Sequence, residues 1–187
     1  MIITSLTPHV LNRHAARALG ILDACWRGLA AQGDVPLWSR VDPADIQDAL
    51  DHAFLAERYG QSHARIRVAG GSVAEMTGGD CAGLPLSLMF RPEDRPAFNE
   101  ALRTACDSRC PIELDLSVAK QDVAARMVLY PLRAESGRIT QLLGGLAPIG
   151  ETVAAPCRFG LVAIRATTPP VMAPARRSHL RLVVNNA

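Results

Sequence analysis

Residues 65–70 read RIRVAG, and the fold prediction for the chain begins with these six residues. Two apolar side chains, Ile66 and Val68, alternate with two arginines, which is typical of an antiparallel strand with one buried and one solvated face. The glycine that closes the stretch suits a strand end. We therefore predict a strand over residues 64–70, with Ile66 and Val68 facing the core and the two arginines facing outward.

The chain before this strand predicts two helices and a first strand. Apolar residues recur at spacings of four and three along residues 8–32, on one face of a helix: Leu11, Ala15, Ala18, Leu22, Cys25 and Leu29. Asp42 followed by Pro43 is the pattern of a helix N-cap and first turn, so a short helix is expected through Leu50. A strand over about residues 52–58 then leads through a turn into the strand that starts at residue 64.

The chain after the strand predicts a crossover and a meander. A glycine-rich segment, 71–90, precedes a helix over about residues 92–108, whose proline and acidic start suits a helix N-terminus. Strands follow over 111–120, 124–133 and 138–147, joined by turns. In the first of these, alternation places Glu113 and Asp115 on an exposed face. Hairpin-linked strands with the helices grouped in the crossover indicate an α+β domain.

These pieces together resemble a bacterial PAS-domain family of small sensor-like proteins. The resemblance rests on Trp26-Arg27 in a helix, the Asp42-Pro43 helix start and the arginine-containing strand that ends at Gly70. It covers residues 20 to about 150. It implies a PAS-like five-stranded antiparallel sheet with crossover helices and an N-terminal helical extension. The expected division is a helical extension over 1–50, a PAS-like core over 51–150 and a basic tail over 151–187.

A PAS fold implies a cavity between the crossover helices and the sheet. The residues expected to face it are apolar, with almost no polar group among them: Ile66, Val68, Met76, Phe90, Phe98, Leu102, Met127 and Leu129. Such a set favours either a filled core or a small hydrophobic ligand, and both interpretations stay open.

The residues that known PAS cofactors need are missing from their expected places. Flavin-binding light sensors carry an Asn-Cys-Arg-Phe helix, whereas residues 80–83 here read DCAG. Haem-binding relatives need a histidine on the long crossover helix, and residues 92–108 contain none. The histidines lack metal-binding spacing, and no catalytic constellation is recognisable. We predict no flavin, no haem, no metal and no catalytic residues.

Composition sets the broad class. The 187 residues are 49% hydrophobic and 20% charged, which is typical of a globular domain. The chain contains no run of 18 apolar residues, so no membrane span is predicted. The start of the chain lacks the features of a signal peptide. The cysteines form no CxxC pair, which favours reduced thiols and a cytoplasmic location.

The end of the chain is basic. After Glu151 come Arg158, Arg165, Arg176, Arg177 and Arg181, and no acidic residue. Nucleic-acid or membrane binding through this tail is an alternative, but the wide spacing of the arginines favours a solvated tail. Apolar runs at 158–166 and 179–185 also predict strands, at least one of which pairs with the sheet or with another subunit.

We interpret the chain as a stand-alone sensory or regulatory module that binds a small apolar ligand or a protein partner and signals by association. The helix over residues 8–32 is the expected homodimer surface, although its apolar face could equally cover the chain's own sheet, with Trp26 as the anchor. The signalling partner is not predicted. The alternative from another class is an enzyme that handles a small molecule in the same pocket.

Overall fold

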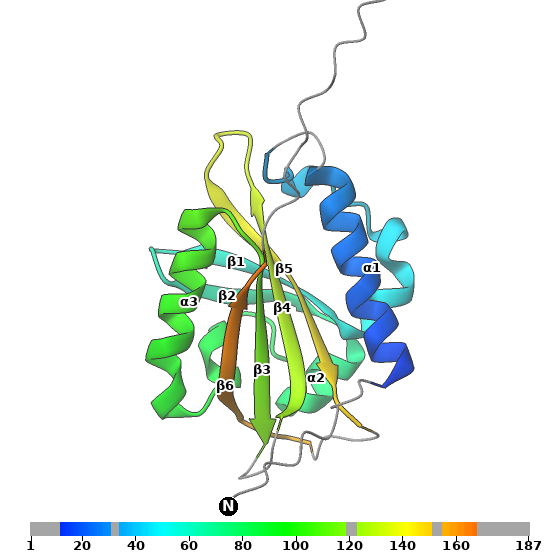
Figure 1. The fold of residues 1–187 in the computed structure, drawn as a ribbon, viewed down its shortest axis with the longest axis vertical. Coiled ribbons are helices and arrows are strands. Elements are labelled where there is room, and N and C mark those ends of the chain that lie inside the picture. Colours follow the sequence, from blue (N-terminus) through cyan, green and yellow to red (C-terminus); the bar gives the residue numbers. More distant parts are fainter. Residues whose placement is uncertain (1–11, 31–33, 119–122, 151–154, 168–187) are drawn as a thin grey trace, which may run out of the picture.

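The computed structural model describes residues 12–30, 34–118, 123–150 and 155–167. The helices and 3₁₀ segments (η) are α1 (Arg13–Ala30), η1 (Trp38–Arg40), η2 (Pro43–His52), α2 (Gly71–Thr77), η3 (Leu86–Met89), η4 (Pro92–Asp94) and α3 (Arg95–Ser108). The strands are β1 (Ala53–Tyr59), β2 (His63–Ala69), β3 (Ile112–Val118), β4 (Val123–Arg133), β5 (Ile139–Pro148) and β6 (Phe159–Ala166). The predicted α+β architecture is confirmed (Figure 1).

The strands form one antiparallel sheet in the order β2-β1-β5-β4-β3-β6. The sheet therefore has six strands where five were predicted. The added strand is β6, which pairs with β3 from Ile112↔Ala166 to Val118↔Phe159. The prediction that at least one of the two apolar runs pairs with the sheet or with another subunit is thus confirmed, by the run at 158–166. The second run, 179–185, lies outside the described residues.

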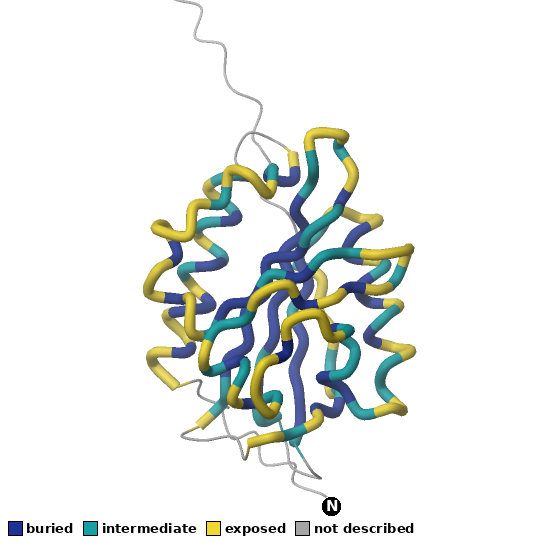
Figure 2. The backbone as a smooth tube through the Cα atoms, turned by 180° about the vertical axis from the view of Figure 1, so that it is seen from behind, coloured by how far each residue is buried: buried dark blue, intermediate teal, exposed yellow. Residues whose placement is uncertain are grey.

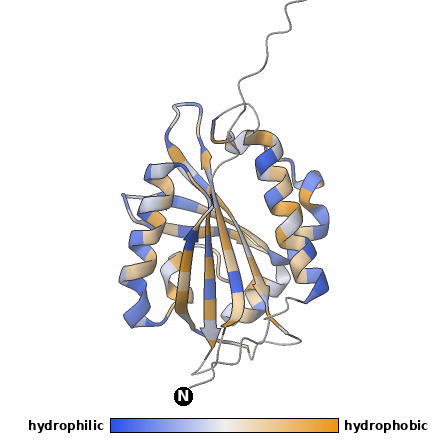
Figure 3. Cartoon of the chain, viewed as in Figure 1, coloured by the Kyte–Doolittle hydropathy of each residue, from blue (hydrophilic) through white to orange (hydrophobic). Residues whose placement is uncertain are grey.

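The central strands of the sheet are covered on both faces. On the inner face, side chains from α2, η3 and α3 pack against it in one cluster that includes Phe90, Phe98 and Leu102. On the outer face, α1 and η2 form a second cluster with β4 and β5. Figure 3 shows the consequence: apolar colour runs along the strands, while α1 and α3 each carry an apolar and a polar side. Seen from behind, the buried backbone lies at the centre of the molecule (Figure 2).

Helix α1 uses its apolar face against its own sheet. Ala15, Ala18 and Leu22 of the predicted seam are buried there, and Trp26 is only 2% exposed. These are the residues that a dimer through the seam would need. The described part of the helix therefore matches the alternative, in which α1 covers the sheet and Trp26 anchors it.

The start of η2 matches the sequence pattern. The Oδ1 of Asp42 accepts a hydrogen bond of 2.8 Å from the main-chain N–H of Ala44, and Pro43 occupies the first helical position. At the other end, η2 lies directly against Gly70. A Cβ at Gly70 would lie 1.9 Å from the carbonyl oxygen of Leu50, so only glycine allows this close approach.

Strand β2 departs from the predicted alternation. Ile66 is buried and Arg65 faces outward as expected, and both Arg65 and Arg67 lie near the carboxylate of Glu57 on β1. Val68, however, is 57% exposed, so its predicted inward orientation is wrong. A register shift between Leu55 and Ala56 of β1 is the cause. Leu55 pairs with Val68 and Ala56 pairs with Ile66, which leaves Arg67 as an extra residue and turns Val68 to the outer face.

Strand β3 also differs from its prediction at Asp115. This residue was expected on an exposed face, yet it is 8% exposed. The guanidinium groups of Arg126 on β4 and Arg165 on β6 lie 3.1 and 2.5 Å from its carboxylate. Arginines from the strands on both sides therefore cover Asp115, which alternation within β3 cannot reveal.

Candidate ligand-binding pocket

An apolar pocket of about 400 Å³ opens on the outer face, between the η1–η2 segment and the sheet. Every residue that lines it is apolar or glycine: Trp38, Val41, Pro43, Ile46, Leu50, Ala53, Phe54, Leu55, Val68, Ala69, Gly70, Leu132 and Leu143. We call it the outer pocket. Its size and lining are those of a site for a small hydrophobic molecule.

Three segments that are distant in sequence build the outer pocket. The η1–η2 segment supplies Trp38 and Leu50, β2 supplies Val68, and the floor comes from β1, β4 and β5. The close approach at Gly70 brings the end of η2 against the end of β2. The bulge in β2 then directs Val68 toward this side.

Large apolar side chains are unusually exposed at the rim of the outer pocket. Trp38 is 48%, Leu50 is 43% and Val68 is 57% exposed. Single exposed apolar residues are common in soluble domains, but a contiguous group beside a concave apolar floor marks a binding surface. A molecule that enters the outer pocket would therefore also bury apolar area of the rim.

The eight residues predicted to bind a ligand lie in two places. Seven of them are buried in the inner core: Ile66, Met76, Phe90, Phe98, Leu102, Met127 and Leu129. Within this set the rings of Phe90 and Phe98 stack with centroids 4.2 Å apart. None of the seven lines the outer pocket, whereas Val68 does. Ligand contact by the seven stays a prediction.

Sequence reasoning missed most of the outer pocket. Trp38 and Leu50 stand in short segments too brief for a periodic pattern, and Leu143 lies in a strand whose buried residues are apolar on both faces. The available signal was the pair of large apolar residues, Trp38 and Leu50, on either side of the Asp42-Pro43 helix start. Such residues have no local partner to pack against, so a nonlocal contact is required.

A second pocket, of about 270 Å³ and lined by both charged and apolar residues, lies where α1 crosses β3 and β4. Here Asp23 accepts hydrogen bonds from Arg27 at 2.6 Å and from the hydroxyl of Tyr130 at 3.2 Å. Burial, followed by the nearby Asp23 carboxylate, raises the pKa of Tyr130 above its usual value. These groups satisfy one another and tie α1 to β4.

The cysteines and the tail add no further site among the described residues. All five cysteines are free thiols, and no three His, Cys, Asp or Glu side chains of the described ranges gather as metal ligands. None of the described helices is long and apolar enough to cross a membrane. Arg158 donates to the carbonyl of Leu88 and Arg165 pairs with Asp115, so both serve the fold. Arg176, Arg177 and Arg181 lie outside the described residues.

The strand order and the crossover helices define a class of α+β domain with an antiparallel sheet and a helical cover on each face. Comparison with protein families names the class, because a PAS-domain model matches residues 14–147. The chain belongs to the PAS-domain family. It is therefore a sensory module in the general sense that this family defines.

Solved structures give weaker similarities. The PAS domain of Bordetella pertussis BvgS is 14% identical, with a TM-score of 0.43 over 54% of this chain and 78% of that chain. An IcIR transcriptional regulator from Alicyclobacillus acidocaldarius is 13% identical, with a TM-score of 0.30 over 76% of this chain and 60% of that chain. A search of curated proteins finds no match.

Proposed function

We propose that this PAS domain senses a small, uncharged apolar molecule that binds in the outer pocket. The observation that carries the proposal is the lining, which contains no titratable side chain among its residues. A charged ligand would lose its hydration there without gaining a partner, whereas an apolar ligand gains from burial.

The expected affinity is modest. A ligand that buries about 200 Å² of apolar surface gains about 5 kcal/mol at 25 cal/mol per Å². This gain corresponds to a Kd of about 0.2 mM, and association costs reduce it, so binding in the millimolar range is expected. That range suits a sensor that responds to a changing concentration of its ligand.

The pocket is placed to influence α1. Ile46 of η2 lines the pocket and also belongs to the outer cluster that buries Leu22 and Trp26 of α1. A ligand that presses on η2 therefore acts on a segment already packed against α1. In the proposed function, the contact between η2 and α1 transmits the effect of ligand binding to a partner or to a second copy of the chain.

Self-association is the output that we propose for this signal. Because the apolar seam of α1 is buried internally, a homodimer through this helix has to use the exposed face, where Ala16, Gly20, Ala24 and Gly28 recur every fourth residue. Light scattering tests this idea directly. A dimeric parent and a folded, monomeric Gly20→Glu variant are expected, since the space around Gly20 is open. A monomeric parent, measured with and without a bound probe, would end the dimer proposal.

The other two functions have less support in the described residues. An enzyme that used the outer pocket would need titratable groups, and none lines it. An adaptor for nucleic acid or membrane would rely on the tail arginines, of which Arg158 and Arg165 already make contacts within the domain.

Trp38 offers a test of the proposed ligand site, because it lines the outer pocket, whereas Trp26 is buried in the outer cluster and does not line it. The probe is N-phenyl-1-naphthylamine, an uncharged fluorophore that brightens in apolar surroundings. We expect saturable binding with energy transfer from tryptophan. The transfer should decrease in Trp38→Phe, because only Trp26 remains as a donor, while the probe still binds.

Two matched valines provide the control. Val68 lines the pocket and is 57% exposed, whereas Val162 on β6 is 52% exposed and lies outside it. Val68→Asp should weaken probe binding at least tenfold, because it places a charge in an apolar site. Val162→Asp should bind as the parent does. Equal binding by parent, Val68→Asp and Val162→Asp would refute the outer pocket as the site.

A further inference from the structure

Three arginines from different parts of the chain line another pocket, of about 340 Å³. Its lining is positively charged, whereas that of the outer pocket is apolar. Arg58 comes from the end of β1, Arg109 follows α3, and Arg138 lies in the turn before β5. The remaining lining residues are Gly60, Cys106, Gly137, Ile139 and Thr140, and no carboxylate is among them. We call this the arginine pocket. It shares no residue with the outer pocket.

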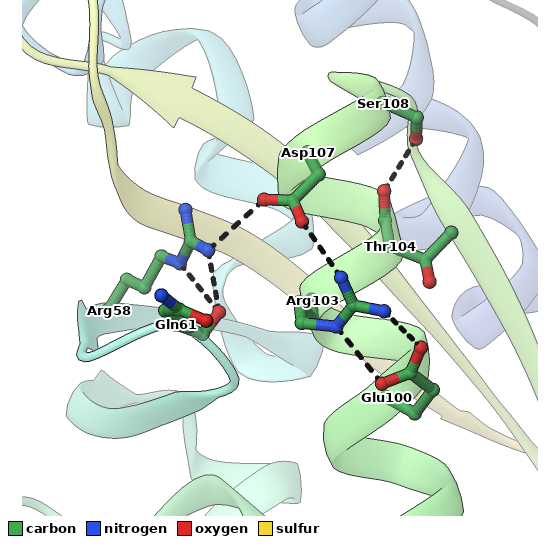
Figure 4. A network of polar contacts seen from close by, with 7 residues as sticks. All are labelled: Arg58, Gln61, Glu100, Arg103, Thr104, Asp107 and Ser108. Carbon is green, nitrogen blue, oxygen red and sulfur yellow. Dashed lines mark hydrogen bonds and ion pairs between the residues drawn. The ribbon is translucent and has the colours of Figure 1, made fainter.

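Arg58 belongs to a network of two guanidinium groups and two carboxylates. Its guanidinium donates to the carbonyl oxygen of Gln61 and lies 3.4 Å from the carboxylate of Asp107 (Figure 4). The same carboxylate also pairs with Arg103 at 3.3 Å. Arg103 in turn pairs with Glu100. Asp107 is therefore shared between two guanidinium groups.

Arg109 shares a single carboxylate with a second arginine, so these three groups keep an excess positive charge. Arg109 lies 2.9 Å from Asp34, whose carboxylate is also 3.2 Å from Arg133. The other end of the guanidinium donates to the carbonyl oxygen of Gly137 at 2.6 Å, which fixes it at the β4–β5 turn. Arg109 adopts a left-handed backbone with φ of 58°, a conformation that glycine tolerates better than arginine. The position thus carries an arginine despite a backbone preference for glycine.

Arg138 completes the group and is exposed, with no ion pair to any residue of the described ranges. Glu135 belongs to the same turn, but it is exposed and does not line the pocket. Thr140 adds a hydroxyl donor. Burial raises the pKa of the Cys106 thiol to about 11, so this group stays neutral near pH 7 and brings no negative charge.

We propose that the arginine pocket binds a small oxyanion, a molecule bearing carboxylate or phosphate groups. Guanidinium groups donate paired, charge-assisted hydrogen bonds that match both groups. Two of the donors are held in place by main-chain carbonyls, and the third is free to close on a ligand. A charged metabolite here and an apolar molecule in the outer pocket would give this PAS domain two separate inputs.

The test is calorimetric titration of the full chain with citrate and, separately, with inorganic phosphate, at constant ionic strength set with sodium chloride. Saturable binding of either probe is expected, with an affinity that falls as salt rises. Citrate alone would assign the site to carboxylates, and phosphate alone to phosphates. Failure of both probes to bind the folded parent would overturn the proposal.

Variants locate the site. Arg138→Gln changes an exposed side chain without ion pairs and should weaken binding about tenfold, the loss of one charge-assisted interaction. Arg109→Gly removes a second guanidinium while suiting the left-handed backbone, and should do the same. Arg17→Gln is the control, because it removes one positive charge from a distant exposed pair with Asp48. Equal weakening by Arg17→Gln and Arg138→Gln would show a general charge effect and overturn the assignment.

Discussion

The indole Nε1 of Trp26 in α1 donates a hydrogen bond of 2.8 Å to the main-chain carbonyl oxygen of Pro131 in β4. The Trp26 ring also lies against Tyr130, with ring centroids 5.8 Å apart. This one side chain therefore joins the N-terminal helix to the middle of the sheet. The contact explains why α1 belongs to the domain core, although it ends at Ala30 and the first strand begins only at Ala53.

Trp26→Phe should destabilise the fold by about 2 kcal/mol, because it removes this hydrogen bond and part of a fully packed side chain. The free energy of unfolding, measured by urea denaturation, checks the value. Trp38→Phe is the matched control and should change it by less than about 0.5 kcal/mol, since Trp38 is half exposed. Equal effects of the two substitutions would contradict the anchor role of Trp26.

Gly70→Ala should be strongly destabilising, by at least ~2 kcal/mol, because the new Cβ would lie 1.9 Å from the carbonyl oxygen of Leu50. The neighbouring Gly71→Ala is the control. Its Cβ would be 3.6 Å from the nearest atom, in the first turn of α2, so a neutral or slightly stabilising effect is expected. Thermal unfolding of both variants tests the pair. A Gly70→Ala variant as stable as Gly71→Ala would mean that η2 does not press on this position.

Asp115→Asn should cost about 1–2 kcal/mol, since it removes the more buried of the two carboxylates, Asp115 and Glu113, that Arg126 and Arg165 share. The figure is below that of a fully buried pair because both arginines keep contact with solvent. Amide hydrogen exchange should show faster exchange in β6, which Asp115 ties to β3. Glu100→Gln, in an exposed pair with Arg103, should leave exchange in β6 unchanged. Unaltered protection of β6 in Asp115→Asn would contradict this role.

The thiol of Cys106 predicts a specific loss of stability at alkaline pH. Burial raises its pKa from 9.0 to about 11, with smaller opposing effects from Arg58 and Asp107. The unfolded chain releases this proton near pH 9 while the folded chain retains it. The contribution of the neutral Cys106 thiol to folding stability is therefore complete below about pH 9 and is lost as pH rises through 9 toward 11.

Between pH 8 and pH 10, the parent should lose about 1 kcal/mol more unfolding free energy than Cys106→Ala. Urea denaturation at both pH values measures the difference, and each protein serves as its own reference at pH 8. Identical pH dependence of the parent and the variant would show that the buried thiol ionises as readily in the folded state as in the unfolded state.

The sequence predicted local elements well because their signals are local. The Asp42-Pro43 cap, the alternation that buries Ile66 and the apolar run of β6 each depend on a few neighbouring residues. Val68 was misassigned because the bulge at Arg67 depends on the register with β1, which the alternation within β2 does not contain. Asp115 was misassigned because its covering arginines come from other strands.

The outer pocket was beyond sequence reasoning for a related reason. Its walls come from η1, η2 and β2, and its floor from strands far along the chain, so no short pattern brings them together. The PAS resemblance instead predicted a cavity on the inner face, between the crossover helices and the sheet. There the candidate residues Phe90, Phe98 and Leu102 are fully buried side chains of the core.

Methyl NMR of the Ile, Leu and Val side chains, recorded during titration with N-phenyl-1-naphthylamine, tests the proposed ligand site most directly. The two faces of the sheet carry different reporter methyls. The outer pocket has Leu50, Val68 and Leu143, and the inner core has Leu102 and Leu129. We predict saturable shifts at the three outer residues and little change at the two inner ones. Shifts at Leu102 and Leu129, with the outer methyls unmoved, would contradict the account and place the ligand inside the core.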